Sequence, residues 1–326
     1  MIYQDTIYGA VNITEPILVA LLETAALQRL RGVLQHGISG LIGVTSPITR
    51  YEHSVGVMLL VRRLGGSVEE QIAALLHDVS HTAFSHVIDY VFNGHNSQSY
   101  HDDKKAVYMM QTELPDVLAQ YGYDWNQFLH EDEFPLLEQP SPHLCADRLD
   151  YFLRDSQGLG LATLSEIRHA LDHLLVAQER IVTDDLQVAR WLGYTFIQAD
   201  DASWANFREV GLYELTAQAI RRGMEIGLIG EADFWGTDRP LWAKMQACTD
   251  AQMQDLLRLI APATQFVWDE AAPTFRVSTK LRVIDPDVAL AGELRPLSTL
   301  DPMFARYRAD YLAGKQGKWP MRVVPA

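Results

Sequence analysis

Apolar residues recur at intervals of three and four positions over most of the chain, which is the spacing of one buried face of an α-helix. This pattern predicts a helix over residues 16–36, which Gly37 would end. The polar, turn-rich segment 93–103 predicts a loop. The other predicted helices cover residues 52–64, 68–78, 83–92, 104–120, 143–156, 164–177, 204–229 and 250–260. The sequence therefore predicts a mainly α fold class.

The pattern changes in two places. Two short β-branched runs within 180–190 flank Asp184 and Asp185, and they predict a small hairpin. Near the end of the chain, TFRVSTKLRVIDPDV and KWPMRVVPA have the composition of strands, and a helix is predicted between them near 301–313. We therefore expect a helical domain over 1–261 and a small C-terminal α+β appendage over 262–326.

Composition narrows the class of partner. The chain has 326 residues, 48% of them hydrophobic, which suffices for one large domain or for a core with a smaller appendage. Its formal net charge is -15 at pH 7. Proteins that bind duplex nucleic acid usually have a broad basic surface, so we do not expect duplex nucleic acid as a partner. Neither a signal-peptide pattern nor an apolar run of membrane-spanning length is present, so we expect a cytoplasmic protein without a membrane partner.

Two histidines and two aspartates could surround one divalent cation. His77 and Asp78 end the apolar run AALLHDV, where polar groups need partners, while His53 and Asp147 lie in two other amphipathic helical runs. This donor set suits a hard or borderline metal, and such a centre activates water and polarises phosphoryl oxygens. The alternative, in which His77 caps its helix and Asp78 faces water, explains the pair but not the four residues together. The sequence therefore predicts a metal-dependent hydrolase of phosphate esters or anhydrides.

The predicted helix 143–156 carries further polar side chains at intervals of three and four residues. Such spacing places them on one helical face, where they could form a wall for a substrate. For Asp150 and Arg154 alone, an ordinary salt bridge one turn apart explains the pattern equally well. The residues on this face are Asp147, Asp150, Tyr151, Arg154 and Asp155.

Four motifs stand in an order and at a spacing that resemble a known family. They are DTIYGAVNITEPILVALLETAALQRLRGVLQHG, TRYEHSVGV, HDVSHTAFSHVID and ADRLDYFLRDSQGLG. Over roughly residues 5–160 the chain resembles the HD-domain phosphohydrolases, and within them the deoxynucleoside triphosphate triphosphohydrolases that include the SAM-and-HD-domain protein. This resemblance implies an HD-type helical bundle whose metal ligands are His53, His77, Asp78 and Asp147. It also implies hydrolysis of a dNTP to a deoxynucleoside and triphosphate.

The resemblance also implies roles for residues around the metal. His81 and His101 would be the acid/base histidines, and Asp89 would orient a histidine. The residues that would hold the phosphates or the sugar are Gln35, Arg50, His86, Arg148, Tyr151, Asp155 and Tyr213, with Gln35 and Asp155 at the sugar 3′-hydroxyl. The sequence departs from the family at His36, where a small or aliphatic residue is usual. On residue type alone, His101 could equally be an ordinary loop histidine and Arg50 a surface arginine.

Several alternatives stay open at this point. An HD core could also serve a nucleotidase or a phosphodiesterase on other nucleotides, because the fold does not choose among them. A non-catalytic nucleotide sensor could transmit binding through residues 262–326, although a sensor needs no acid histidine. The donor set accepts iron, manganese, zinc, nickel or magnesium, and a second Mg²⁺ could bind with the substrate phosphates. An apolar stripe on 204–229 would permit a homo-oligomer.

Overall fold

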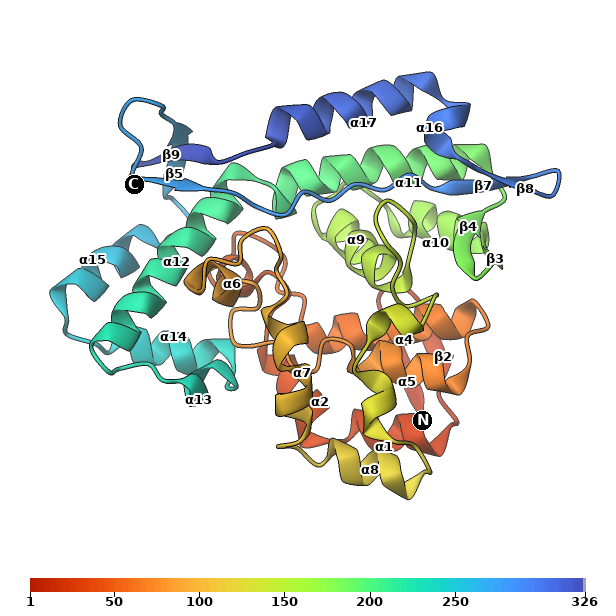
Figure 1. Ribbon diagram of the computed structural model, residues 1–326, viewed down its shortest axis with the longest axis horizontal. Helices are drawn as coiled ribbons and strands as arrows, with labels where there is room; N and C mark the ends of the chain where they lie inside the picture. Colours follow the sequence, from red (N-terminus) through yellow and green to blue (C-terminus); the bar gives the residue numbers. More distant parts are fainter. Residues whose placement is uncertain (325–326) are drawn as a thin grey trace.

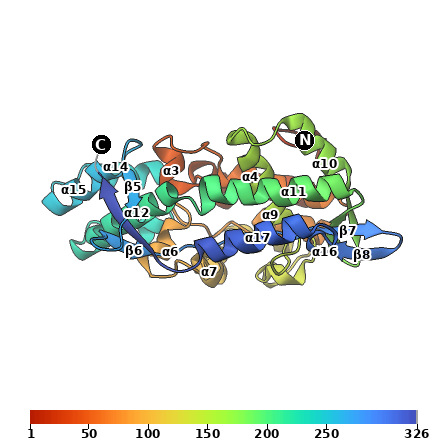
Figure 2. The same cartoon turned by 90° about the horizontal axis from the view of Figure 1, so that it is seen from above.

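Helices dominate the computed structural model, which describes residues 1–324 and confirms the mainly α class (Figures 1 and 2). The helices up to the middle of the chain are α1 (Pro16–Leu22), α2 (Ala25–Arg29), α3 (Gly37–Leu41), α4 (Arg50–Arg63), α5 (Val68–Leu76), α6 (Val87–Val91), α7 (Tyr100–Met109), α8 (Leu114–Gln120), α9 (Ala146–Gly158) and α10 (Leu164–Asp172). The later helices are α11 (Leu186–Ala199), α12 (Phe207–Glu225), α13 (Glu231–Phe234), α14 (Asp238–Gln246), α15 (Ala251–Leu259), α16 (Leu297–Leu300) and α17 (Pro302–Lys315).

Helix α4 lies at the centre of the largest hydrophobic core and packs against α5 and α9. A capping box starts this helix: the Thr49 hydroxyl accepts from the Glu52 backbone N–H, and the Glu52 carboxylate accepts from the Thr49 backbone N–H. From Tyr51 to Val61 every residue except Glu52 is buried. The capping box and the packing against α5 and α9 together hold His53, which is in the first turn of α4, deep inside the molecule.

A second core surrounds α12, which packs against α6, α3 and α15. The strands β5 (Gln265–Trp268), β9 (Trp319–Val324) and β6 (Phe275–Val277) form an antiparallel sheet with β9 in the middle. Strands β5 and β6 also contact α12, and the Phe266 ring lies against Gly211, where a side chain would collide with it. The sheet of β5, β9 and β6 therefore supports α12, which forms one side of the candidate active site.

The remaining strands also tie late residues to earlier ones. The hairpin β3 (Leu174–Ala177) and β4 (Arg180–Thr183) is extended by β7 (Asp287–Leu290) and β8 (Glu293–Pro296) in the order β3-β4-β7-β8. Strand β7 pairs with β4 in parallel, with Val288 opposite Thr183. Helix α17 lies alongside α11 (Figure 2). A small C-terminal sheet region is thus present, while the division of the chain at 261 stays a prediction.

The predicted helix 16–36 is not continuous, because Thr24 ends one helix and starts the next. Its hydroxyl donates to the Leu21 carbonyl and accepts from the Leu27 backbone N–H. A short 3₁₀ turn follows at Leu30–Gly32, and Gly37, at φ +48°, begins α3 rather than ending a helix. The remaining hairpin, β1 (Ile2–Asp5) with β2 (Gly9–Asn12), was not predicted either.

Three other boundaries also differ from the prediction. The hairpin turns at Gln178 and Glu179, both with positive φ, and not at Asp184 and Asp185 as predicted. Asp185 instead caps α11 by accepting from the backbone N–H groups of Gln187 and Val188. Helices α11, α13 and α14 were not predicted. Helix α7 begins at Tyr100, inside the predicted loop, and α6 is shorter than the predicted 83–92 because Phe84 and Ser85 adopt positive φ.

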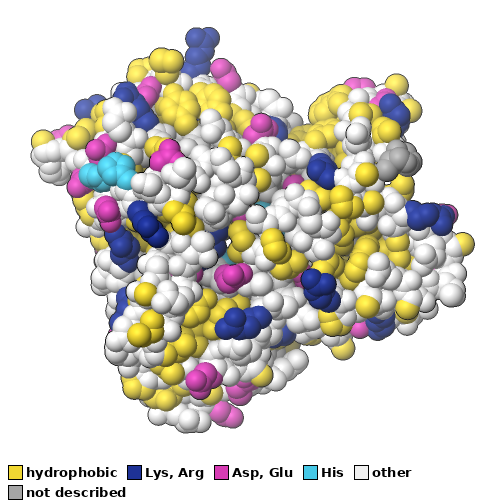
Figure 3. Space-filling model, turned by 180° about the vertical axis from the view of Figure 1, so that it is seen from behind, with side chains coloured by type: hydrophobic (Ala, Val, Ile, Leu, Met, Phe, Trp, Pro, Cys, Tyr) yellow, Lys and Arg dark blue, Asp and Glu magenta, His cyan; other side chains and the backbone are white. Residues whose placement is uncertain are grey.

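On the face shown in Figure 3, acidic and basic side chains are interspersed among hydrophobic ones. Within residues 1–324, no helix combines the length and the apolar character that crossing a bilayer requires. The cytoplasmic location and the homo-oligomer stay predictions.

Candidate active site

A cavity of about 360 Å³ opens beside α9 and is walled by residues from the first and the last parts of the chain. Pockets of this size hold small organic ligands. The structure brings most of the predicted site residues to this cavity, with His53 and Asp89 lying behind its wall. Those that line it are Gln35, Arg50, His77, Asp78, His81, His86, His101, Asp147, Arg148, Tyr151, Asp155 and Tyr213.

Three of the predicted metal ligands meet at one point. His53 comes from the first turn of α4, His77 from the C-terminal end of α5, and Asp147 from the first turn of α9. His53 Nε2 lies 3.2 Å from His77 Nε2 and 3.0 Å from Asp147 Oδ1. One donor atom from each residue lies within 4.8 Å of the other two, as expected of groups that share an ion.

Hydrogen bonds behind the two histidines orient both rings. His77 Nδ1 lies 2.7 Å from the Ala74 carbonyl, and because a carbonyl can only accept, this nitrogen carries the proton. His53 Nδ1 lies 2.8 Å from Asp150 Oδ2. Both Nε2 atoms are therefore left to point at the shared site, which is how second partners usually hold a metal-binding imidazole.

Asp78 lies at the edge of this group. Its carboxylate oxygens are 3.5 Å from His77 Nε2 and 3.6 Å from His53 Nε2, and Arg50 Nη1 donates to Oδ2 at 2.6 Å. Burial would raise the pKa of Asp78, but Arg50, His77 and His81 hold that pKa well below its usual range. Asp78 is therefore ionised and can bind a cation.

The chemistry of this donor set fits a divalent metal ion. Burial disfavours a charge on His77, yet Asp78 and Asp147 raise the pKa of this histidine to about 10. These two carboxylates thus hold a proton on the neighbouring imidazole when no other positive charge balances them. A divalent cation would displace such protons and compensate the same carboxylates. The structure accordingly fits a metal held by His53, His77, Asp78 and Asp147.

The sequence placed Asp150 on the face of 143–156 that could form a substrate wall, but Asp150 does not line the cavity and is instead a positioning residue behind His53. Its buried carboxylate binds His53 Nδ1 and accepts from Tyr8 Oη at 2.9 Å and from Arg154 Nε at 2.8 Å. The salt bridge to Arg154 that residue spacing suggested therefore exists, and the same carboxylate also orients His53. The available signal was its position three residues after Asp147, on the same helical face.

We expect Asp150→Asn to weaken metal binding by roughly 10- to 100-fold, because the carboxylate behind His53 is lost. Titration of the metal-depleted protein with Mn²⁺ measures this affinity. Asp172→Asn is the matched control, since Asp172 pairs with Arg63 at the exposed surface. Equal Mn²⁺ affinity in Asp150→Asn and the parent protein would refute the positioning role.

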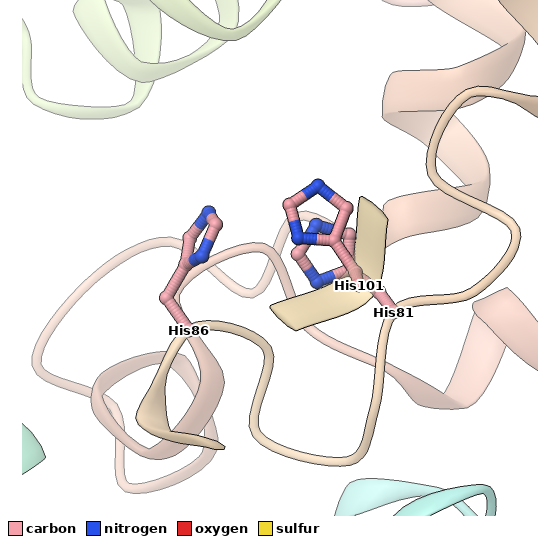
Figure 4. Close-up of side chains that lie close together, drawn as sticks. All are labelled: His81, His86 and His101. Atoms are coloured by element: carbon pink, nitrogen blue, oxygen red, sulfur yellow. The ribbon is translucent and has the colours of Figure 1, made fainter. Parts of the chain in front are cut away.

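Three further histidines lie together on the cavity wall (Figure 4). His81 follows α5, His86 precedes α6, and His101 is in the first turn of α7. The rings of His81 and His101 stack with centroids 3.8 Å apart, and His86 stands at 89° to His81 with centroids 4.9 Å apart. Their nitrogens are close enough for an ion. Because the rings of His81 and His101 are stacked, however, the lone pairs of their nitrogens lie in parallel planes and do not converge on a single ion.

Burial governs the ionisation of these histidines. Burial and then Arg50 lower the pKa of His81 to about 3 and that of His86 well below its ordinary value. Burial also lowers the pKa of His101. His81 Nε2 lies 3.1 Å from Asp78 Oδ1 without the alignment of a hydrogen bond. Without a bound anion, all three are therefore neutral imidazoles near pH 7.

Carboxylates stand beside two members of this trio. Asp89 Oδ2 lies 3.1 Å from His86 Nδ1, and Asp89 Oδ1 accepts from the Tyr100 backbone N–H, so Asp89 can orient His86. Asp102 Oδ1 lies 3.2 Å from His101 Nε2, and about half of the Asp102 side chain is exposed. Asp102 was not singled out from the sequence, although it directly follows His101.

The two predicted phosphate-binding arginines differ in their surroundings. Arg50 is buried and donates to Ser85 Oγ and Asp78, while its Nη2 has no hydrogen-bond partner among the described residues. Arg148 instead donates to Glu138 Oε1 at 3.0 Å and to backbone carbonyls. Arg50 therefore has an unused donor at the cavity, whereas Arg148 is held largely by its own chain.

The opposite end of the cavity combines amide, carboxylate and aromatic groups. Gln35 Oε1 is buried and lacks a partner within residues 1–324. Asp155 contacts His36 Nε2 at 2.8 Å through Oδ1 and accepts from Trp204 Nε1 at 2.7 Å through Oδ2. If Asp155 binds a sugar hydroxyl as predicted, its carboxylate does so while it also contacts His36 and Trp204. Trp204 was not singled out from the sequence.

Tyrosines complete this end of the cavity. The Tyr151 ring meets Trp204 edge-on with centroids 4.8 Å apart, and Tyr213 meets Tyr90 with centroids 5.6 Å apart. All four rings line the cavity, and burial raises the pKa of both Tyr151 and Tyr213, so their hydroxyls are neutral donors near pH 7. The substrate roles of these residues stay predictions.

Comparison with known proteins agrees with this chemistry. A family model described as the HD domain matches residues 50–155. The protein named metal-dependent phosphohydrolase cns2, from Cordyceps militaris, is 38% identical over 325 residues, covering 97% of this chain and 93% of the relative. A protein from Dictyostelium discoideum named deoxynucleoside triphosphate triphosphohydrolase SAMHD1 homolog is 24% identical over 209 residues, covering 55% of this chain and 40% of that protein.

A solved structure shares the fold. The crystal structure of a phosphohydrolase from Bacteroides thetaiotaomicron superposes with a TM-score of 0.71 at 17% identity, covering 99% of this chain and 98% of that chain. The matched segment 50–155 contains all four residues of the metal cluster, and the Cordyceps relative extends over nearly the whole chain. This chain therefore belongs to the HD-domain family of metal-dependent phosphohydrolases.

Proposed function

We propose that this phosphohydrolase cleaves a deoxynucleoside triphosphate at the α-phosphate and releases the deoxynucleoside and inorganic triphosphate. The observation that carries the proposal is one cavity that joins the metal cluster, the histidine trio and the Gln35–Asp155 end. A nucleotide matches this arrangement, because its phosphates suit the metal cluster and the histidine trio, and its sugar and base suit the Gln35–Asp155 end. The distant relative named a deoxynucleoside triphosphate triphosphohydrolase supports the same reading.

The metal cluster defines where the bond is cleaved. When bound, a divalent cation supplies Lewis-acid polarisation of a phosphoryl oxygen and lowers the pKa of water towards ~7. Asp150 and the Ala74 carbonyl keep the two imidazoles turned towards that point. Arg50 holds Asp78 with one nitrogen and offers its unpaired Nη2 to a phosphate oxygen. The scissile phosphate would thus lie between Arg50 and the cluster.

The stacked pair of His81 and His101 can supply the proton for the leaving 5′-oxygen. Both rings are neutral in the unliganded protein, and the negative charge of bound phosphates raises the pKa of a neighbouring histidine. Asp102 next to His101 favours the same protonated form. His101, or His81 beneath it, would then act as the general acid. His86, held by Asp89, remains available to donate to a phosphate oxygen.

The other predicted contacts follow from their places on the wall. Tyr151, Tyr213 and Arg148 line the cavity and can contribute donors to phosphates or sugar. Gln35 offers its unpaired carbonyl to the sugar 3′-hydroxyl. His36, which holds Asp155, brings an imidazole to the sugar end where the family usually has a smaller side chain. A nucleotide screen should therefore compare ribose with deoxyribose substrates.

Product analysis tests the proposal directly. Incubation with each dNTP and Mn²⁺ or Mg²⁺ should yield equal amounts of deoxynucleoside and inorganic triphosphate, separated by anion-exchange chromatography. Orthophosphate from a nucleoside monophosphate would instead indicate a nucleotidase, and a linear dinucleotide would indicate a phosphodiesterase. Tight nucleotide binding without hydrolysis under any metal would indicate a sensor. Each of these three results contradicts the proposed reaction.

A further inference from the structure

The C-terminal part of the chain contributes a wall of the cavity. Thr279, Lys280, Leu281, Arg282 and Val283 line it together with the metal cluster and the histidine trio. These residues belong to the connection between β6 and β7, which runs alongside α11 without forming a helix (Figure 1). They lie outside the segment 50–155 that matches the HD domain. The site therefore includes charged groups that the HD motifs do not supply.

Lys280 and Arg282 are cations without an acidic partner. Neither forms an ion pair with a carboxylate among residues 1–324, although Arg282 donates to Gln98 Oε1 and to the Lys280 carbonyl. By contrast, Arg148 on the same cavity wall is paired with Glu138. An anionic ligand would compensate the two charges.

The position of these cations relates them to the phosphate end of the cavity. After burial and Arg50, Arg282 and Lys280 are the next causes that lower the pKa of His86. Burial and then Arg282 also lower the pKa of Lys280, while Asp147 and Glu138 raise it, so Lys280 lies near both Arg282 and the metal cluster. Positive charge thus approaches His86 both from Arg50 in the HD segment and from the C-terminal connection.

We propose that Lys280 and Arg282 form a subsite for the terminal phosphates of a polyphosphorylated substrate. This inference rests on the proposed function, and it identifies the substrate class as nucleoside triphosphates rather than monophosphates. The negative charge of a single phosphate at the metal cluster is already compensated by the metal ion and Arg50. The positive charges of Lys280 and Arg282 are compensated only when the substrate carries additional phosphates.

Binding of inorganic triphosphate isolates this subsite from catalysis. Calorimetric titration uses the full chain with its bound metal, with Mg²⁺ in excess over triphosphate in both solutions. We expect Lys280→Gln and Arg282→Gln each to weaken triphosphate binding roughly tenfold, because each removes one charge-assisted contact. Affinity for orthophosphate should stay within about twofold of the parent protein, because orthophosphate binds at the metal and Arg50.

The controls separate a subsite from a general charge effect. Arg276→Gln removes an equal charge from an exposed position on β6, where Arg276 pairs with Glu270, and should leave triphosphate affinity unchanged. Arg282→Lys keeps the charge and should recover most of the affinity. Unchanged triphosphate binding in both glutamine variants, absent binding in the parent protein, or an equal loss in Arg276→Gln would overturn the inference.

This experiment can fail separately from the proposed reaction. If no nucleotide yields inorganic triphosphate as a product, the proposed function is wrong, whatever Lys280 and Arg282 bind. If triphosphate is released but both glutamine variants bind it normally, the reaction stands and the subsite is wrong.

Discussion

His77→Ala is expected to lower turnover by roughly a thousandfold or more, because a metal centre contributes several kcal/mol to transition-state stabilisation. The substitution removes one of the two imidazoles whose Nε2 atoms meet 3.2 Å apart and leaves Asp147 and Asp78 without that donor. Steady-state hydrolysis of the best nucleotide substrate measures the loss. Asp78→Asn, which keeps the side-chain shape but removes the charge, should have an effect of similar size.

The matched control for His77→Ala is His173→Ala. His173 pairs with Asp184 at the surface and does not line the cavity, so its replacement should leave turnover unchanged. Circular dichroism of both variants checks that the helices remain. Full activity of a folded His77→Ala protein would refute the metal site as the catalytic centre.

Removal of the metal is expected to abolish activity and to lower the stability of the fold. The four ligands come from α4, from the two residues that follow α5, and from α9, so no such site exists in the unfolded chain. At a metal concentration a thousandfold above its Kd, bound metal adds about 4 kcal/mol to the free energy of unfolding. Thermal denaturation before and after chelation should show a clear fall in Tm.

Re-addition of metal provides the control for chelation. Mn²⁺ or Fe²⁺ restored to the chelated protein should recover both Tm and turnover, whereas the same additions to His77→Ala should recover neither. A chelated protein that keeps its activity and its Tm would show that the fold and the chemistry do not depend on a bound cation.

Helical spacing predicted one part of the cavity wall, the polar face of 143–156, whereas the family resemblance implied the other site residues of the HD segment. Asp147, Tyr151 and Asp155 recur every four residues, and α9 turns all three to the cavity. The HD-family membership inferred from the four motifs is confirmed. The individual catalytic and substrate-binding roles stay predictions, because the structure shows the side chains together but not what they bind.

Residues that act through contacts between distant segments could not be predicted in this way. The role of Asp150 depends on α9 lying beside His53 of α4, and periodicity alone does not specify that packing. Lys280 and Arg282 reach the cavity because the connection between β6 and β7 is tied back by the pairing of β7 with β4. That parallel pairing joins strands about a hundred residues apart in sequence and leaves no short-range pattern.

The errors in the fold have local causes. A short apolar, β-branched run fits either a strand or the first turn of a helix, which is why the run after Asp185 was assigned to a hairpin instead of α11. Thr24 could have indicated the break between α1 and α2, since threonine commonly caps helices, but apolar spacing continues across it.

The metal site is tested most directly by an anomalous diffraction map of the protein crystallised with Mn²⁺, combined with elemental analysis. We expect one strong anomalous peak within bonding distance of His53, His77, Asp78 and Asp147, at one equivalent of metal per chain and absent from His77→Ala. Metal bound elsewhere, or none bound while hydrolysis proceeds, would contradict this expectation.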